Sequence, residues 1–285
     1  MTDGIAADNA SGPRETKLKK IGFIGAGQMA KALAIGIAKS KQDGVEFTFS
    51  DPSDAASQSF EELISPHSSV TRATDNQSLI DGSEIVFLAV KPQFLASALD
   101  GLSFETSSPL VVSIAAGVEI FQLQRMTNSE RIIRVMPNTP CLIGQGACAM
   151  TPGEAVSESD AAVVEGFLGL VGKVVTVKES LMDSVTGLSG SGPAYVFSFI
   201  EALVDGAVMT GMSRATAREL AIQTVIGAAM MVEQTGEHTA VLRDRVTSPG
   251  GTTIAGLKAL EENAFRDGVM SAVQAATERS MELGD

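Results

Sequence analysis

The segment that most constrains the fold of this 285-residue chain reads IGFIGAGQMAKALAIGIAKS, at residues 21–40. It places Gly25, Gly27 and Ala30 as G-x-G-x-x-A between an apolar strand pattern and a helical pattern. In such a turn the first glycine permits a tight reversal, the second lets the backbone approach a pyrophosphate, and the small third residue allows close helix–strand packing. The helix N-terminus adds N–H donors. The segment predicts a dinucleotide-binding turn, and a glycine-rich turn without a ligand is the alternative.

Alternating strand and helix patterns extend this turn into a domain. Between Lys20 and about Lys178, short β-rich runs alternate with helical stretches, which predicts a parallel sheet with crossover helices. The runs are KIGFIG, VEFTFS, EIVFLAV, PLVVSIA, RIIRVM, GACAM and KVVTV. Several are apolar without alternation, as expected for strands buried on both faces.

Beyond Glu179 the pattern changes to long apolar helices without further strand patterns. We predict an α/β fold with a flexible tail at 1–17, an N-terminal Rossmann-type dinucleotide-binding domain at 18–179, and an all-helical C-terminal domain at 180–285. From Ala217 to Val232 apolar residues recur at helical spacing, and much of the remaining stretch is also small or apolar. A helix of this kind in so short a domain predicts burial against a second copy, and therefore a homo-oligomer, either a dimer or an assembly of dimers.

Charge and cysteine content exclude several classes of partner. The net charge of −13 and the lack of a basic cluster argue against binding to nucleic acid. The two cysteines, Cys141 and Cys148, are too few for a disulfide framework and match no zinc or redox spacing, so we expect a reducing compartment and no metal site. The first 20 residues lack the apolar region of a signal peptide, and Glu201 and Asp205 interrupt the most apolar region, so a cytoplasmic protein without a membrane span is expected.

Asp51 follows the second strand pattern, where a carboxylate would accept hydrogen bonds from both adenosine ribose hydroxyls. This position favours NADH, because the carboxylate would repel the 2′-phosphate of NADPH and no Arg or Lys lies between Lys41 and Arg72 to compensate. The alternative is that Asp51 only starts a turn with Pro52.

Two further loops are expected to face the nicotinamide half of the cofactor, because ligands of open α/β sheets bind at the carboxyl ends of strands. One is Ala89-Val90-Lys91-Pro92 and the other is Ala115-Ala116-Gly117. A solvated surface lysine is the alternative for Lys91.

Three more motifs carry a family resemblance: Met136-Pro137-Asn138-Thr139-Pro140, GLSGSGPAY at 187–195, and SPGGTT at 248–253. With them the chain resembles pyrroline-5-carboxylate reductase from about Lys20 to about Glu282. The resemblance implies reduction of the C=N bond of 1-pyrroline-5-carboxylate to L-proline, the last step of proline biosynthesis. The implied hydride donor is NADP or NAD in its reduced form.

Carried over by position, the resemblance also implies the residues of the site. The implied cofactor contacts are Phe23, Ile24, Gly25, Ala26, Gly27, Gln28, Met29, Asp51, Asn76, Ala89, Val90, Lys91, Pro92, Ala115, Ala116 and Gly117. The implied substrate loop is Val246, Thr247, Ser248, Pro249, Gly250, Gly251, Thr252 and Thr253. Thr253 would lie near the ring nitrogen as the catalytic residue, with the backbone of Gly250 and Gly251 near the carboxylate. The family often has a small hydroxyl residue, and a preference for NADPH, where this chain has Asp51.

The substrate loop leads to a compatible interpretation on physical grounds. Consecutive N–H groups in a turn that enters a helix form an anion-binding concavity suited to a carboxylate. A plain helix start with Thr252 or Thr253 as the N-cap is the alternative. A protonated imine is already electrophilic, so hydride transfer needs positioning more than acid–base groups. The two histidines, His67 and His238, lie outside the motifs.

Two other functions are considered. A β-hydroxyacid dehydrogenase has a similar order of domains, but its lysine, four residues after the last glycine of a G-x-x-G-x-G segment, corresponds to Val196 here. A non-catalytic NAD(P)-binding sensor or scaffold is compatible with the fold alone. The second glycine-rich loop argues against it, because a sensor needs no separate carboxylate site.

Overall fold

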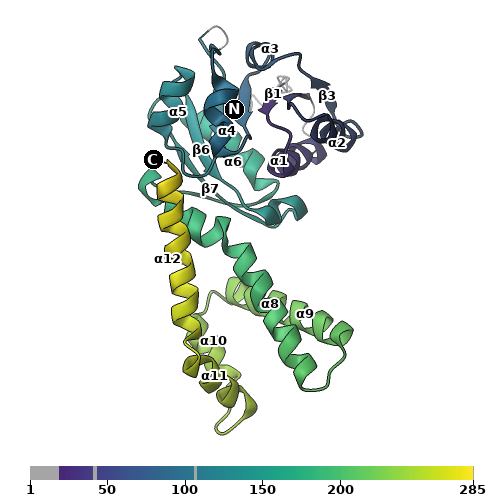
Figure 1. Ribbon diagram of the computed structural model, residues 1–285, viewed down its shortest axis with the longest axis vertical. Coiled ribbons are helices and arrows are strands. Elements are labelled where there is room, and N and C mark those ends of the chain that lie inside the picture. Colours follow the sequence, from purple (N-terminus) through teal and green to yellow (C-terminus); the bar gives the residue numbers. More distant parts are fainter. Residues whose placement is uncertain (1–18, 41–43, 106–107, 285) are drawn as a thin grey trace, which may run out of the picture.

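The computed structural model describes residues 19–40, 44–105 and 108–284, and the predicted tail at 1–17 lies outside them. An N-terminal sheet with flanking helices stands above a helical region (Figure 1). The sheet has the strand order β3-β2-β1-β4-β5-β6-β7-β8. The strands are β1 (Lys19–Ile24), β2 (Val45–Ser50), β3 (Ser69–Arg72), β4 (Ile85–Leu88), β5 (Leu110–Ser113), β6 (Ile132–Met136), β7 (Gly146–Pro152) and β8 (Gly172–Thr176).

The described strands pair in parallel, except for β6 and β7, which pair antiparallel. Only the short 3₁₀ helix η1 (Thr139–Ile143) separates these two strands, and a parallel crossover needs a dozen or more residues. The predicted parallel sheet with crossover helices is confirmed for the other strand pairs, and this pair departs from it. The sequence patterns also missed β3, a four-residue edge strand in which Val70 is half-buried and its neighbours are exposed.

Both faces of the sheet are covered by helices, which explains why the central strands are apolar without alternation. One face packs against α1 (Gln28–Lys39), α2 (Asp54–Ile64) and α6 (Glu158–Gly169), and the other packs against α3 (Asn76–Asp81), α4 (Pro92–Leu99) and α5 (Ile120–Thr127). Phe23 of β1 is fully buried in the first layer and stacks on Phe87 of β4, with ring centroids 4.8 Å apart. Burying one such ring contributes about 2–3 kcal/mol.

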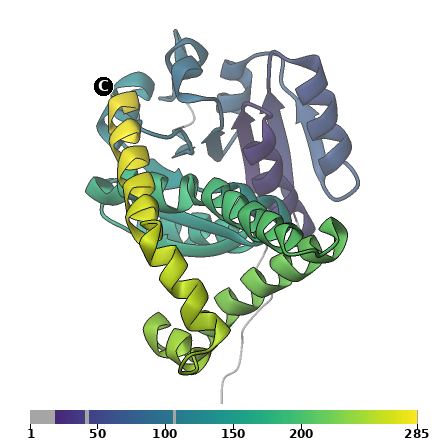
Figure 2. The ribbon, with the colours of Figure 1, turned by 60° about the horizontal axis from the view of Figure 1, so that its bottom comes forward.

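The region after β8 is helical throughout the described residues, as predicted. It begins with three short turns, η2 (Glu179–Leu181), α7 (Met182–Val185) and the π-helical turn η3 (Thr186–Gly190), and continues with α8 (Gly192–Met209), α9 (Arg214–Thr235), α10 (Thr239–Arg245), α11 (Thr252–Glu262) and α12 (Phe265–Gly284). The pair α8 and α9 forms one arm, and α12 leads back to the sheet from a second arm made with α10 and α11 (Figures 1 and 2).

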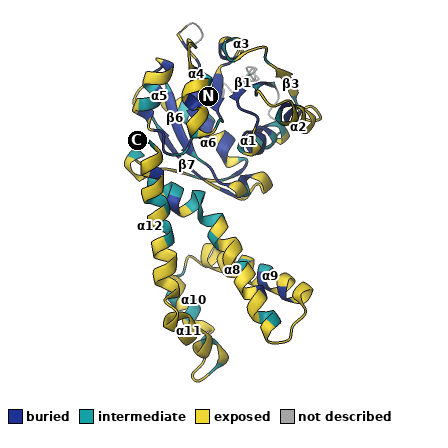
Figure 3. Cartoon of the chain, viewed as in Figure 1, coloured by how far each residue is buried: buried dark blue, intermediate teal, exposed yellow. Residues whose placement is uncertain are grey.

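Most residues of the two arms are exposed (Figure 3), and many of them are apolar. In α9 only Ala217 and Ala221 are buried, whereas Leu220, Ile226 and Met230 are each about half exposed. Within the described residues, the continuous helical run at 179–209 is long and apolar enough to cross a membrane, by length and composition alone. Only 6% of its most apolar window is buried. Within one chain, no other described element packs against most of the apolar surface of these helices.

A buried cation ties the two regions together. Arg134 of β6 is 3% exposed, with Nη1 3.5 Å from the Glu179 carboxylate and Nη2 3.6 Å from the Asp183 carboxylate. Asp183 also accepts a 2.7 Å hydrogen bond from the Ser280 hydroxyl of α12. The junction therefore joins β6, the first helical turns and the C-terminal helix through one charge network.

Candidate active site

The glycine-rich turn lies between β1 and α1 as predicted. Gly25 has φ +101°, a left-handed conformation that favours glycine, and a Cβ there would meet the Ala89 carbonyl oxygen at 2.7 Å. Its N–H donates to the Ser50 carbonyl at 2.8 Å, so the ends of β1, β2 and β4 meet at this residue. Gly27 is the N-cap of α1, without a side-chain cap, and a Cβ there would meet no atom within 4 Å. The turn therefore presents backbone to open space.

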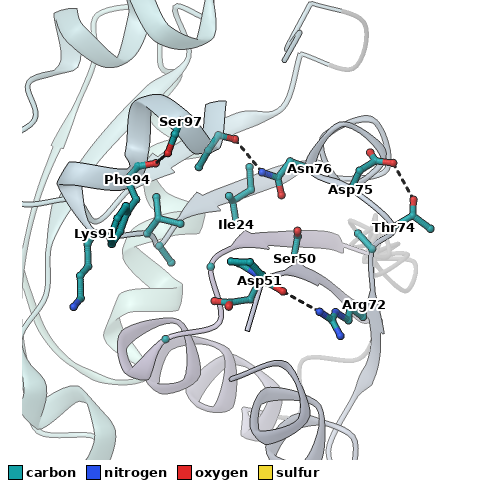
Figure 4. Close-up of a pocket in the computed structure, with 17 residues that line it drawn as sticks. Ile24, Ser50, Asp51, Arg72, Thr74, Asp75, Asn76, Lys91, Phe94 and Ser97 are labelled. Carbon is teal, nitrogen blue, oxygen red and sulfur yellow. Dashed lines mark hydrogen bonds between the residues drawn. The ribbon is translucent and has the colours of Figure 1, made fainter. Parts of the chain in front are cut away.

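A cavity of about 850 Å³ opens beside this turn, along the carboxyl ends of the strands (Figure 4). This volume is in the range of cofactor sites. Half of the predicted cofactor contacts line it: Ile24, Gly25, Gly27, Asp51, Asn76, Ala89, Val90 and Lys91.

The other predicted contacts lie outside this lining. Ala26, Gln28 and Met29 belong to the turn and the first turn of α1, and Pro92 starts α4. The side chain of Phe23 faces the core. Ala115, Ala116 and Gly117 follow β5, and Gly117 is buried under the end of α12, where a Cβ would meet the Ser280 carbonyl oxygen at 2.9 Å.

Several lining residues were missed by the sequence patterns: Ser50, Pro52, Arg72, Ala73, Thr74, Asp75, Phe94, Ser97 and Ala98. Three of them, Arg72, Ala73 and Thr74, end or follow β3, the strand that no pattern indicated. Next to them, hydrogen bonds from the Ser78 amide and the Thr74 hydroxyl hold the pKa of Asp75 below its usual range. Recognising β3 as a strand would have placed this stretch at the cavity.

Asp51 acts within the turn as well as at the cavity. Its Oδ2 accepts from the Ala26 amide and its Oδ1 from the Ser53 amide, both at 2.8 Å. The carboxylate thus links the glycine-rich turn to the start of α2. Each carboxylate oxygen can accept two hydrogen bonds, so this structural role is compatible with contact to ribose hydroxyls. The turn-forming interpretation and the ribose interpretation can hold together.

The predicted substrate loop at 246–253 connects α10 to α11, at the end of the molecule opposite the sheet (Figure 1). It is largely exposed, with Val246 62% accessible. Gly250 has φ +68°, and Gly251, with no side-chain cap, is the N-cap of α11. The alternative, in which Thr252 or Thr253 is the N-cap, is therefore wrong, since both are helical residues. Within one chain the loop and the cavity are not brought together.

The motif GLSGSGPAY packs the arms onto the sheet. A Cβ on Gly187 would meet the Thr277 hydroxyl of α12 at 2.3 Å, and a Cβ on Gly190 would meet Met136 Cε at 2.5 Å. Asn138 donates from Nδ2 to the Ser189 carbonyl at 3.0 Å. These glycines therefore serve close packing at the junction. Within the described residues, no cluster of three or more His, Cys, Asp or Glu side chains is arranged to hold a metal ion.

Two family models match the chain. Residues 179–283 match the model for pyrroline-5-carboxylate reductase dimerisation, and residues 20–117 match the model for NADP oxidoreductase coenzyme F420-dependent. Among curated proteins, pyrroline-5-carboxylate reductase of Arabidopsis thaliana is 44% identical, covering 93% of this chain and 95% of its own. The Escherichia coli protein of the same name is 40% identical, covering 93% and 98%. This chain belongs to the pyrroline-5-carboxylate reductase family.

Solved structures agree with this membership. A Plasmodium falciparum pyrroline carboxylate reductase with NADP bound is 35% identical, with a TM-score of 0.83 over 95% of this chain and 99% of that one. The Streptococcus pyogenes 1-pyrroline-5-carboxylate reductase is 32% identical, with a TM-score of 0.84 over 92% and 98%. The chain is thus an NAD(P)H-dependent oxidoreductase of proline biosynthesis. An Aspergillus terreus reductive aminase at 18% identity and TM-score 0.56 shares the fold alone.

Proposed function

We propose that the chain reduces 1-pyrroline-5-carboxylate to L-proline with a dinucleotide held in the cavity and the imino acid held by the loop at 246–253. The adenosine half would lie toward Asp51, the pyrophosphate at the glycine-rich turn, and the nicotinamide half toward Lys91 and the loop at 115–117. This orientation follows the usual arrangement of open α/β sheets. The observation that carries the proposal is the cavity built on this turn in a chain of this family.

The glycine-rich turn fits a pyrophosphate. Gly27 leaves open space where a side chain would intrude, and the uncapped N-terminus of α1 offers N–H donors and partial positive charge. The bound dinucleotide, in its reduced form, supplies the hydride. The residues of this chain bind and orient it and leave its nicotinamide edge facing the substrate.

The substrate loop fits a small carboxylate. Gly251 starts α11 without a side-chain cap, so the first amides of that helix can bind the carboxylate of the imino acid. Thr253, in the first turn of the same helix, would accept a hydrogen bond from the ring N–H of the protonated imine. Hydride addition would then leave a neutral amine, which takes a proton from water. Because the protonated imine is electrophilic, these contacts need only position it for hydride transfer.

The separation of loop and cavity in one chain implies that two copies complete the site. The exposed apolar faces of α8 and α9 lie in the region that matches the dimerisation model. We therefore propose a homo-oligomer, a dimer or an assembly of dimers, formed through the C-terminal helices at 180–285. The proposed partners are this second copy and a small imino acid, with no nucleic acid and no membrane. We also propose a cytoplasmic location, in line with the small number of cysteines, Cys141 and Cys148, and with their buried, unbonded thiols.

The direct test is oxidation of NADH or NADPH by the purified protein with pyrroline-5-carboxylate added. Turnover that requires the imino acid supports the proposal. Reduction of NAD⁺ or NADP⁺ by a β-hydroxyacid would instead favour the dehydrogenase. Dinucleotide binding without turnover of either substrate would favour the non-catalytic sensor.

A mixing experiment tests the shared site. Gly27→Glu places a charge in the open space of the turn, and Thr253→Asp places one beside the expected substrate carboxylate, at a helix start that tolerates Asp. Each variant alone should be inactive. If the site combines two chains, random dimers of an equal mixture should recover about a quarter of wild-type activity, because half are mixed and each of these keeps one intact site. No recovery in co-expressed mixed dimers would show that each site lies within one chain.

A further inference from the structure

Arg72 is a cation at the adenosine end of the cavity. It ends β3, where its Nη2 donates to the Asp51 carbonyl at 3.0 Å and its Nη1 pairs with Asp54 Oδ1 at 2.9 Å. Figure 4 shows Arg72 beside Asp51, with Lys91 at the other end of the lining. Arg72 and Lys91 are the cations among the residues that line this cavity. The expectation that no arginine is near Asp51 therefore does not hold in the folded chain.

We propose that Arg72 is the specificity-determining residue for the adenosine 2′-phosphate, so that the enzyme accepts NADPH in spite of Asp51. This inference rests on the proposed function, because it concerns the same dinucleotide. A planar guanidinium can donate two parallel hydrogen bonds to phosphate oxygens, which a lysine in this place could not match.

The geometry of Asp51 leaves room for this contact. Its carboxylate is turned to the amides of Ala26 and Ser53, whereas Arg72 is held by the Asp51 main-chain carbonyl. The Arg72 guanidinium and the Asp51 carboxylate thus have different hydrogen-bond partners and do not pair with each other. At the adenosine end of the cavity, Asp51 can then accept hydrogen bonds from ribose hydroxyls, and Arg72 of the neighbouring strand can bind a 2′-phosphate.

Arg72 can exchange its ion-pair partner, Asp54, for a phosphate with little loss of stability. The side chains of Arg72 and Asp54 are 42% and 92% exposed, and exposed pairs contribute little to stability. A phosphate monoester has nearly two negative charges near neutral pH and three acceptor oxygens. It should therefore displace the single carboxylate of Asp54. Asp54 acts as a competitor that weakens binding of the 2′-phosphate.

The test uses 2′,5′-ADP, which has the 2′-phosphate but no nicotinamide, and ADP, which lacks the 2′-phosphate. Calorimetry would measure both affinities for the wild type, Arg72→Ala, Arg72→Lys and Asp54→Asn. Arg125→Ala is the matched control, because Arg125 is exposed on α5 of the same region and lies outside the cavity lining. Melting curves would confirm that each variant is folded.

We expect Arg72→Ala to lower the affinity for 2′,5′-ADP by about tenfold or more and to change the affinity for ADP little. Arg72→Lys should restore part of the lost affinity, and Asp54→Asn should raise the affinity for 2′,5′-ADP. Arg125→Ala should change neither affinity. The ratio of kcat/KM for NADPH to that for NADH should fall in Arg72→Ala in parallel. Equal effects on both ligands, or no effect in a folded variant, would overturn the inference. A wild type that shows these affinities but never reduces pyrroline-5-carboxylate would instead refute the proposed function.

Discussion

The side-chain amide of Gln122 donates a 2.6 Å hydrogen bond to the main-chain carbonyl of Gly284, which fixes the last turn of α12 to the first turn of α5. Gln122 also accepts from the Glu119 amide at 2.8 Å, so it is held from both sides. Directly before this contact lies Gly117, packed against Ser280. The helix that closes the second arm therefore ends on the loop expected to face the nicotinamide.

Gly117→Ala should destabilise the protein by about 1–3 kcal/mol, because φ is +76° and the new Cβ would meet the Ser280 carbonyl at 2.9 Å. Gly101→Ala is the matched control, with φ +71° and no atom within 4 Å of its Cβ. Urea unfolding of both variants measures the difference. Equal losses would mean that only backbone strain matters and that the contact with α12 contributes nothing.

Thr253→Ala should lower kcat/KM for pyrroline-5-carboxylate and leave cofactor affinity nearly intact, because its hydroxyl is assigned to the ring nitrogen. The loss of one such hydrogen bond should cost about 1–3 kcal/mol in the transition state. Steady-state kinetics and cofactor titration provide the two measurements, with Thr252→Ala as the neighbouring control. Parallel losses in cofactor affinity and turnover would contradict this assignment.

Ile226→Glu should dissociate the oligomer, because it places a charge on the exposed apolar face of α9 that we expect a second copy to cover. Light scattering at micromolar concentration should give at least a dimer for the wild type and a smaller mass for the variant. Phe121→Glu is the control, since Phe121 is 62% exposed on α5, which lies far from α8 and α9 (Figure 1). A wild-type monomer with full activity would rule out the shared site.

Asp51 leads to a prediction on cofactor choice. The wild type should use NADH at least as well as NADPH, because the Asp51 carboxylate accepts from ribose hydroxyls whereas Asp54 competes with the 2′-phosphate for Arg72. Asp51→Ser should relax this discrimination. The structure adds that the substitution also removes acceptors for the Ala26 and Ser53 amides, so affinity for both cofactors should fall. The NADH/NADPH ratio of kcat/KM separates the two effects. An unchanged ratio would leave Asp51 with its turn-forming role alone.

The residues around Gly25 show what local sequence could predict. Glycine spacing predicted the turn. Apolar runs predicted the buried strands on either side of it and the change to helices. β3 was missed because SVTR is short, polar and at a sheet edge, and Arg72 was missed with it. The antiparallel pairing of β7 could have been predicted, because only residues 137–145 separate the runs RIIRVM and GACAM, and this connection is too short for a crossover.

The candidate site was predicted as a set of loops, but not as a geometry. The distance between Gly27 and Thr253 depends on how the arms leave the sheet, and no local pattern encodes that. Arg134 was a missed signal of another kind, since a charge inside the apolar run RIIRVM indicates buried carboxylate partners.

Because the apolar faces of α8 and α9 are uncovered in one chain, formation of the active enzyme should depend on the concentration of newly made chains. All eight described strands of the sheet belong to one chain, whereas the arms would remain uncovered until a second chain packs against them. In the proposed dimer, this last step is second order in protein concentration. Where few chains are made, a larger share should remain half finished and open to proteases. We therefore expect the amount of mature enzyme to rise more steeply than gene dosage.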